Sequence, residues 1–438
     1  LVAMLPKGGT RDPEDRRPIV LLASVYRLWS ATRAVTFRGW LVEAGILEAA
    51  GPGRAADAQA YEAALVFELA RSRGDQLAGV ALDWSKCYDR LPLVLLEEFA
   101  AKAGMPRALV GPMLAAYRQP RRLVVDGMAG VLRAPVCGLA PGCPAATDWL
   151  ALVMSPWLFK ARRLSAGVRA RAYVDDLTAW SLGLGCREDV AALVNLVEAF
   201  ERDTGLVIHR GKSCRFAFPW ELAAELREDG AMPIKQGVRD LGVCQTVAEG
   251  SSAGGDLGRA DLAVLRCGRI AVMPLPYRWK AHVARASAVS AGVFGLASGP
   301  VKDAWVTSLR SAVKRSVLRG AKFASTAAFF WGLGLPWRLD PAAHVVVTPW
   351  KVLSDAVRRG APTWDDLLGL WEASIGGTGG PMEAARKSLV WAGVEGSLLR
   401  WEGGPRGALV LPLSAPEAVW RDFLLSALER SQSLRLAQ

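Results

Sequence analysis

The sequence is poor in the residues that build structural metal sites and disulfide frameworks. It contains three histidines and seven cysteines, and no two cysteines have CxxC spacing. An odd number of cysteines without paired spacing excludes a disulfide framework, and so few histidines leave no ligand set for a standard zinc module. We therefore expect a protein of a reducing compartment.

Long uncharged apolar runs are missing as well. Residues 134–147 contain three prolines and residues 323–337 are interrupted by glycine, and both runs are shorter than the ~18 residues that a membrane-spanning helix needs. The first residue is Leu1, and no basic leader with an apolar stretch follows it. We expect no membrane association, and we interpret the chain as a fragment that starts inside a domain.

Positive charge is in excess. Lys and Arg outnumber Asp and Glu by 54 to 42 in 438 residues, which gives a net charge of +12. This balance favours a polyanionic partner, and nucleic acid is the first candidate. About half of the residues are apolar, which is enough for a buried core and for two or three domains.

Apolar spacing and turn residues predict alternating strands and helices up to about residue 218. Strands are expected at residues 19–22, 77–82, 206–208 and 215–218, and hairpins at residues 123–133 and 168–181. Helices are expected at residues 24–44, 92–104, 106–117, after Pro144, and at 190–200 with an end at Gly205. From Asp83 onward the order is β-α-β-β-α-β, an antiparallel sheet with helices on one face, which predicts an α+β fold.

Three aspartates fall at the ends of predicted strands. Asp83 follows the strand at residues 77–82, and Asp175 with Asp176 lies in the turn of the second hairpin. Adjacent strands would bring these carboxylates to one sheet edge, where hard oxygen ligands select Mg²⁺ or Mn²⁺. Two such ions about 4 Å apart are what phosphoryl transfer onto a nucleic-acid end requires. An acidic pair in a turn is also common without any catalytic role, so its neighbours must decide.

Six short segments resemble, in order, the motifs of reverse transcriptases. The first segment resembles fingers motifs of the non-LTR (LINE-type) retrotransposon branch. The middle three resemble the palm motifs, and the last two resemble the motifs that follow the catalytic centre in that branch. The segments are residues 5–7 with 16–19 (LPK, RRPI), 82–91 (LDWSKCYDRL), 138–144 (GLAPGCP), 172–176 (AYVDD), 205–213 (GL with KS) and 241–243 (LGV).

The resemblance implies a right-hand polymerase fold. We expect fingers at residues 1–76, a β-α-β-β-α-β palm at 77–250, a mostly helical thumb at 251–330 and a helical, Trp-rich region of unknown function at 331–438. The implied activity is RNA-directed DNA synthesis with an RNA template, a DNA primer and deoxynucleoside triphosphates. Such a protein would work in the nucleus or cytoplasm as a ribonucleoprotein.

The resemblance also implies the metal ligands and the acid of the reaction. Asp83 and Asp175 would bind the metal ions, with Asp176 as a supporting acid. Lys212 resembles the lysine that protonates the leaving pyrophosphate. Equally, a lysine after Gly211 is an ordinary solvated side chain.

Four further residues would bind substrate. Lys7 and Arg17 would hold the incoming triphosphate. Tyr88 occupies the position of the aromatic gate residue that excludes nucleotides with a 2′ hydroxyl. The alternative interpretation is that Tyr88 is a half-buried residue that only packs against the palm. Gly142 belongs to the segment that lies against the template and the new base pair.

The match departs from the family at two positions. Pro141 replaces the usual Gln before the second glycine of residues 138–144, and Ala146 replaces a later Ser. Proline also removes a backbone donor. These changes support a second hypothesis, a catalytically impaired remnant that still binds nucleic acid. A group II intron maturase is a related alternative, while Tyr88 argues against an RNA-dependent RNA polymerase.

The region beyond residue 250 carries weaker signals. Arg259, Arg266 and Arg269 would lie on one face of a helix at 257–272, a stripe that suits a phosphate backbone. Residues 376–380 (GGTGG) are typical of a linker. Eight of the 17 tryptophans follow residue 330, and we expect most of them in a core rather than stacked on bases.

Overall fold

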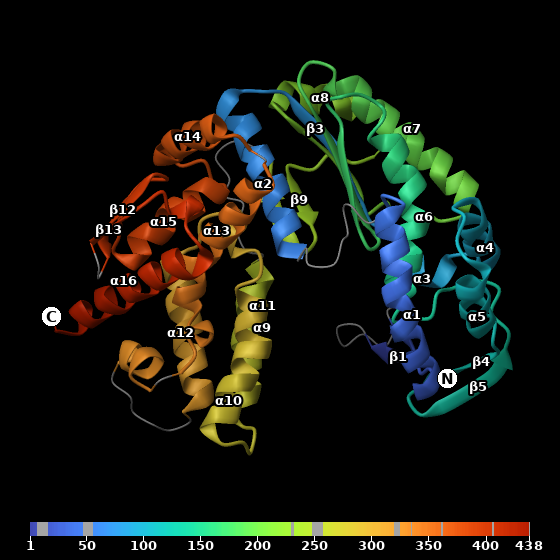
Figure 1. Cartoon of the computed structure of the whole chain (residues 1–438), viewed down its shortest axis with the longest axis horizontal. Helices are drawn as coiled ribbons and strands as arrows, with labels where there is room; N and C mark the ends of the chain where they lie inside the picture. The colour runs from blue at the N-terminus through green and yellow to red at the C-terminus, as the bar shows by residue number, and fades with distance from the viewer. Residues whose placement is uncertain are drawn as a thin grey trace. The chain divides into compact units, whose positions relative to one another are not determined.

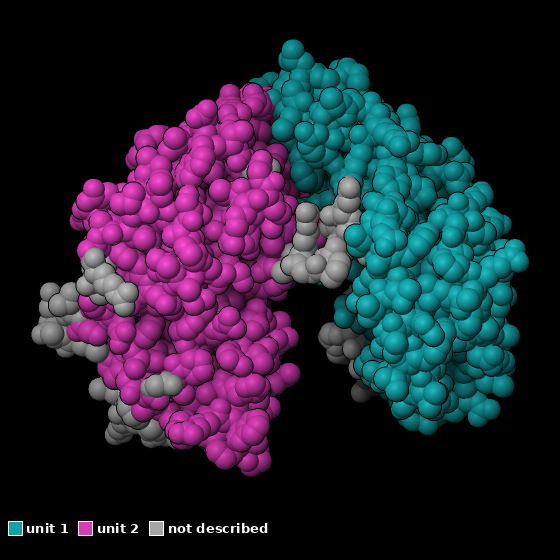
Figure 2. Space-filling view, in the orientation of Figure 1, with its two compact units in different colours: residues 1–54, 76–217, 221–235 teal, residues 55–75, 218–220, 236–438 magenta. Residues whose placement is uncertain are grey.

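The computed structural model describes residues 1–6, 16–46, 56–228, 232–247, 257–318, 325–333, 335–360, 362–404 and 407–437. Contacts divide the chain into two compact units, which Figure 2 shows in teal and magenta. Unit 1 consists of residues 1–54, 76–217 and 221–235, and unit 2 consists of residues 55–75, 218–220 and 236–438. Helices and sheets occur in both units, so the chain has an α+β fold.

Unit 1 is built from two four-stranded sheets with helices packed on them (Figure 1). Its strands are β1 (Val2–Pro6), β2 (Arg16–Val20), β3 (Leu77–Leu82), β4 (Arg121–Val125), β5 (Met128–Arg133), β6 (Arg169–Tyr173), β7 (Asp176–Leu182) and β8 (Cys214–Phe218). Its helices are α1 (Ser24–Glu43), α3 (Cys87–Arg90), α4 (Leu93–Lys102), α5 (Arg107–Tyr117), α6 (Ala146–Ala161), α7 (Cys186–Thr204) and α8 (Trp220–Glu228).

The central sheet has the strand order β6-β7-β3-β8. In chain order this is the split β-α-β-β-α-β arrangement that the sequence predicts. One face carries Val80, Leu177 and Ala179 into the core beneath α6 and α7. On the other face Gly79 is required, because a Cβ there would lie 2.5 Å from Cζ of Phe216.

Helix α7 shows why the sequence predicts this part well. Val190, Leu193, Val197 and Phe200 recur at helical spacing and are all buried. Gly205 ends the helix with φ +68°, and its N–H donates to the carbonyl of Glu201 at 2.9 Å. Of the predicted strand at 206–208, only a single bridge between Trp84 and Ile208 forms.

The second sheet has the order β2-β1-β4-β5. Asp126 and Gly127 both have positive φ in the two-residue turn between β4 and β5, which confirms the predicted hairpin. The guanidinium of Arg16 donates to both carboxylate oxygens of Asp126, at 3.0 and 2.8 Å. This bidentate contact ties β2 to the hairpin.

Unit 2 is mainly helical (Figure 1). Its α-helices are α2 (Ala56–Arg73), α9 (Leu257–Ala271), α10 (Tyr277–Val283), α11 (Ser290–Gly292), α12 (Asp303–Val317), α13 (Pro341–Arg358), α14 (Trp364–Ala373), α15 (Pro381–Ala392) and α16 (Glu417–Ala437). Its strands are β9 (Gly237–Asp240), β10 (Val243–Thr246), β11 (Glu395–Gly396), β12 (Arg400–Gly404) and β13 (Gly407–Val410). Short π and 3₁₀ turns are η2 (Ala284–Val289), η3 (Leu296–Ser298), η4 (Ala328–Gly332), η5 (Trp337–Leu339), η6 (Ser374–Gly376) and η7 (Pro412–Ser414).

The C-terminal tryptophans mostly form the core of unit 2, as predicted. Trp350, Trp371, Trp401 and Trp420 are buried, whereas Trp364 is exposed. The rings of Trp350 and Trp401 meet edge to face with centroids 4.5 Å apart, and the indole N–H of Trp350 donates to Ser388 at 2.8 Å. These buried rings cannot stack on bases.

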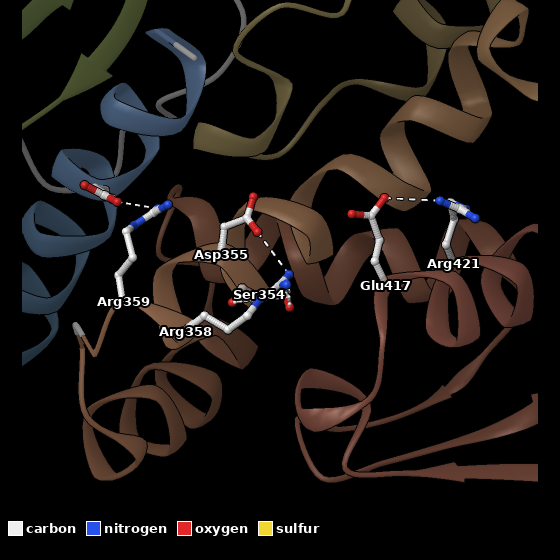
Figure 3. A network of polar contacts seen from close by, with 7 residues as sticks. Ser354, Asp355, Arg358, Arg359, Glu417 and Arg421 are labelled. Atoms are coloured by element: carbon white, nitrogen blue, oxygen red, sulfur yellow. Dashed lines mark hydrogen bonds and ion pairs between the residues drawn. The ribbon is translucent and has the colours of Figure 1, made fainter. Parts of the chain in front are cut away.

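Charged side chains on the surface of unit 2 form local pairs (Figure 3). Arg358 donates to Asp355 at 3.0 Å, Arg421 contacts Glu417 at 3.2 Å, and Arg359 pairs with Glu62 of α2. Each of these arginines therefore has a carboxylate partner.

The linker predicted at residues 376–380 is wrong. This segment joins η6 to α15 inside unit 2 and packs on the buried Glu68. Thr378 and the N–H of Met382 both donate to the Glu68 carboxyl, the latter at 2.8 Å, and a Cβ on Gly380 would collide with it. Gly380 is therefore needed for close approach to Glu68, and Gly377 and Gly379 suit their positive φ angles of +88° and +69°.

The arginine stripe predicted along residues 257–272 is also wrong in part. Arg259 donates to the carbonyl of Gly242 at 2.8 Å and lies over Phe294, and Arg266 donates to the carbonyl of Ser287 at 2.8 Å. Only Arg269 of the three is exposed. Two of these cations are used for packing within unit 2.

The division into fingers, palm, thumb and C-terminal region stays a prediction. Contacts group α2 with unit 2, whereas the predicted division places its residues in the fingers. Within the described ranges, no helix has the length and apolar character to cross a membrane. The seven cysteines lie in the described residues and form no disulfide there.

Candidate active site

One cavity of unit 1 gathers most of the predicted site residues. It has a volume of about 780 Å³. Six of the eight predicted residues line it: Arg17, Asp83, Tyr88, Gly142, Asp175 and Lys212. Asp176 does not line it, and Lys7 lies outside the described residues.

Hydrogen bonds to the N–H and the carbonyl of Asp83 hold this residue at the cavity. It follows the last residue of β3, Leu82, which pairs with Leu177 of β7. Its N–H donates to Oγ of Ser213 at 3.0 Å, and its carbonyl accepts the N–H of His209 at 2.7 Å. The loop at residues 209–213 is therefore fastened to Asp83 at two points.

This loop carries Lys212 to the same carboxylate. Nζ of Lys212 lies 3.1 Å from Oδ2 of Asp83, and the two side chains are 53% and 31% exposed. The N–H groups of Lys212 and Ser213 both donate to the carbonyl of His209 at 2.9 Å, which closes the loop. The backbone of His209 thus both closes this loop and fastens it to Asp83.

Asp175 sits in the two-residue turn between β6 and β7. Tyr173 and Asp176 face each other across the ladder, and Val174 has φ +58°. A β-branched residue in this region is unfavourable, so the surrounding strands must impose the turn. Burial raises the pKa of Asp175, and the nearby Asp83 carboxylate raises it further, while Lys212 lowers it.

Tyr88 reaches the cavity from the short helix α3. Its carbonyl accepts the N–H of Leu139 at 2.7 Å, which joins α3 to the segment at residues 138–144. The ring is half-buried. Burial raises the pKa of the Tyr88 hydroxyl, and so does the Asp175 carboxylate, which lines the same cavity.

Gly142 has a backbone that other residues adopt poorly. Its φ is +109°, and a Cβ there would lie 3.1 Å from the carbonyl of Val20. The neighbouring Pro141 accepts the N–H of Val20 at 2.9 Å. These contacts tie the segment to the end of β2, whose exposed Arg17 also lines the cavity.

Further polar residues line the cavity and were not predicted to act there, among them Lys86, Asp89 and Thr147. Thr147 follows Ala146, the position at which the resembled motif has Ser, so a hydroxyl is present one residue later. A motif comparison that tolerates a shift of one residue would have found it.

The donor set of this cavity suits a hard divalent cation. Asp83 and Asp175 offer carboxylate oxygens, and Mg²⁺ typically takes one or two carboxylates together with waters and phosphate oxygens. Within the described parts of the chain, no three His, Cys, Asp or Glu side chains form a ready-made metal site. The third predicted ligand, Asp176, is exposed.

Comparisons with known proteins give distant structural neighbours. No protein-family model and no curated protein matches the chain. Apo telomerase from Candida tropicalis, truncated from its C-terminal domain, has a TM-score of 0.34 and 14% identity over 44% of this chain and 41% of that one. Telomerase from Candida albicans in complex with a fragment of telomeric RNA has a TM-score of 0.41 and 12% identity over 81% and 55%. Apo telomerase from Candida tropicalis has a TM-score of 0.42 and 9% identity over 79% and 61%.

The chain thus spans about two-fifths to three-fifths of the length of these neighbours. TM-scores this low carry no argument about activity. The case for function therefore rests on the sequence motifs and on the cavity.

Proposed function

We propose that the chain is an RNA-directed DNA polymerase that adds deoxynucleotides to a primer 3′ end, as part of a non-LTR retrotransposon polyprotein. The observation that carries the proposal is the single cavity lined by Asp83, Asp175, Tyr88, Lys212 and Arg17. These residues are 195 positions apart at most in the chain, and the ordered motifs select the same ones.

Asp83 and Asp175 would hold Mg²⁺ or Mn²⁺, with Asp176 in support. The ions would supply charge neutralisation at the attacking hydroxyl and the leaving pyrophosphate. Arg17, with Lys7, would bind the triphosphate, and the ring of Tyr88 would exclude a 2′ hydroxyl. Lys212 would exchange its contact with Asp83 for the pyrophosphate and protonate it.

A second candidate is an impaired polymerase that binds an RNA–DNA hybrid without turnover. It is favoured by Pro141, which lines the cavity without an N–H to donate, and by the buried Ala146, which lacks a hydroxyl. The hydroxyl of Thr147 in the same lining supports the active form. A maturase-like enzyme would share the cavity and differs only in its substrate RNA.

Primer extension on an RNA template with Mg²⁺ separates the candidates. We expect the chain to incorporate deoxynucleotides, and Asp83→Asn and Asp175→Asn to lower the rate by about 10³-fold, because metal charge stabilisation is worth several kcal/mol. Asp203→Asn, which removes an exposed carboxylate of α7 outside this cavity, serves as the matched control.

Incorporation that survives both cavity substitutions would refute the assignment of the site. Absence of incorporation by the unmodified chain, with salt-sensitive binding of an RNA–DNA hybrid, would instead support the impaired form.

A further inference from the structure

Unit 2 contains a cavity of its own, far along the chain from the aspartates of unit 1. It has a volume of about 950 Å³ and lies between the start of α12, the loop at residues 377–379 and α15. Its charged and aromatic lining consists of Lys302, Asp303, Glu383, Arg386, Lys387 and Trp391. The sequence motifs assign no function to this region.

The two carboxylates of this cavity already have partners. Glu383 accepts the N–H of Gly379 at 2.7 Å and lies 2.6 Å from Nζ of Lys387. Asp303 accepts the indole N–H of Trp391 at 3.0 Å. Neither carboxylate is directed at the remaining two cations.

Those two cations, Lys302 and Arg386, have no carboxylate partner in the part of the chain that the structure describes. Lys302 is exposed, and the half-buried Arg386 has a buried Nε without an acceptor. The arginines in Figure 3 differ, because Arg358 and Arg421 are each paired within the same unit. Two cations in the lining of one cavity, both with unused donors, suit an anion from outside.

The aromatic side chain in the lining, Trp391, indicates which kind of anion the cavity would bind. Trp391 is half-buried against the core of unit 2, and its contact with Asp303 fixes the orientation of the ring. Val301 and Val390 add apolar surface to the same lining. A planar ring beside two cations matches a base next to its phosphate.

We propose that this cavity binds an unpaired nucleotide, with the phosphate on Lys302 and Arg386 and the base stacked on Trp391. A nucleic-acid strand is favoured over a phosphorylated peptide because every nucleotide of a strand combines a flat base with a phosphate, whereas only phosphotyrosine does so in a peptide, and because the chain has a net charge of +12. The site lies wholly in unit 2, so it does not depend on the polymerase activity proposed for unit 1.

Photocrosslinking locates the site directly. The probe is an unpaired 12-nucleotide RNA with 5-iodouracil, irradiated with the full chain and mapped by mass spectrometry. We expect a crosslink at Trp391. If the crosslinks fall only outside residues 301–303 and 386–391, the proposal is overturned, whatever the variants below show.

Salt-dependent binding of the same RNA, labelled with fluorescein, tests the cations. Each phosphate contact with a single strand contributes about 0.7 to the slope of log K against log salt, so Lys302→Gln with Arg386→Gln, which removes the contact with one phosphate, should reduce the slope by about 0.7. We expect affinity to fall about tenfold near 0.1 M salt, and Trp391→Leu to weaken binding about fivefold with an unchanged slope.

Arg358→Gln with Arg421→Gln is the control, because it removes the same charge from paired arginines of unit 2. Equal slopes in the two double variants would overturn the proposal.

Uridine monophosphate added as a competitor separates two possible ligands of the cavity, a free nucleotide and a nucleic-acid strand. Displacement at equal nucleotide concentration indicates a free nucleotide, and displacement only at a hundredfold excess indicates a strand; both retain the phosphate-and-base chemistry. Thermal unfolding checks that the variants are folded.

Discussion

Each unit holds an aspartate beside a cation, but the two pairs differ in access to water. In unit 1, Lys212 touches Asp83 through one contact of 3.1 Å, and both side chains are partly exposed. In unit 2, Arg310 donates to both oxygens of Asp340 at 2.8 Å, and the side chains are only 9% and 1% exposed. Asp340 also accepts the N–H of Ala342 as the N-cap of α13, and Arg310 donates to Gln432.

The difference shows how one kind of pair serves stability or chemistry. Burial raises the pKa of Asp340 while Arg310 lowers it, and the saturated oxygens leave no place for a ligand. The open pair in unit 1 leaves carboxylate oxygens unused beside a second acid, Asp175. A ligand is able to compete only for the open pair.

Replacement of the cation in each pair gives the largest expected difference between the two units, a difference in the loss of unfolding free energy. Arg310→Met should lower the free energy of unfolding by about 3–5 kcal/mol, because it leaves a buried charge uncompensated. Lys212→Met should cost less than about 1 kcal/mol, because the exposed pair is screened by water. Urea unfolding of both variants measures the two losses, and equal losses would break the comparison.

The Lys212→Met substitution should instead slow DNA synthesis. We expect the rate of nucleotide incorporation to fall about 10²-fold through loss of the general acid. Arg310→Met should leave incorporation unchanged at temperatures where the variant is folded. Single-turnover primer extension measures both rates, and a similar fall in the two variants would show that the open pair has no special role.

Glu68 shows that a buried carboxyl group of unit 2 can also lower stability when it ionises, because desolvation disfavours its charged form. Burial raises the pKa of Glu68 to about 7. An acid with a raised folded pKa binds more protons in the folded state, so stability is greatest below the ordinary pKa near 4.5 and falls as pH rises towards 7. Glu68→Gln should remove this fall and stabilise the protein by roughly 2–3 kcal/mol at pH 8.

Unfolding at pH 4.5 and pH 8 supplies the test for Glu68. The glutamine keeps an oxygen for the N–H of Met382, so the variant and the unmodified chain should agree at pH 4.5. A variant less stable than the unmodified chain at pH 8 would contradict the shift.

Tyr88 tests whether a half-buried ring in the open cavity acts on substrate rather than on packing. Tyr88→Ala should raise the ratio of ribonucleotide to deoxynucleotide incorporation about tenfold, since one lost steric contact is worth 1–3 kcal/mol. Tyr88→Phe keeps the ring and should retain the selectivity. Competition between the two nucleotides in primer extension measures the ratio, and unchanged selectivity in Tyr88→Ala would contradict the gate.

Local patterns were sufficient for most of unit 1. The strand at residues 77–82 and the turn at Asp126-Gly127 lie where sequence places them, because periodicity and turn chemistry act over a few residues. The second hairpin turns at Val174-Asp175, and Asp176, which the sequence predicts in the turn with Asp175, is instead the first residue of β7. The same local reasoning failed for residues 376–380. Their glycines resemble a linker, but Thr378, Gly380 and Met382 pack against a partner more than 300 positions away, Glu68.

The sequence by itself determined which residues stand at strand ends and turns, among them Asp83 and Asp175. Only the tertiary structure decided which charges meet, because that depends on contacts between distant segments. It placed Lys212 on Asp83, turned Arg259 and Arg266 inward, and left Arg386 without an acceptor. Burial then decided the chemistry of each charge, since water satisfies an exposed group and a buried one needs a partner.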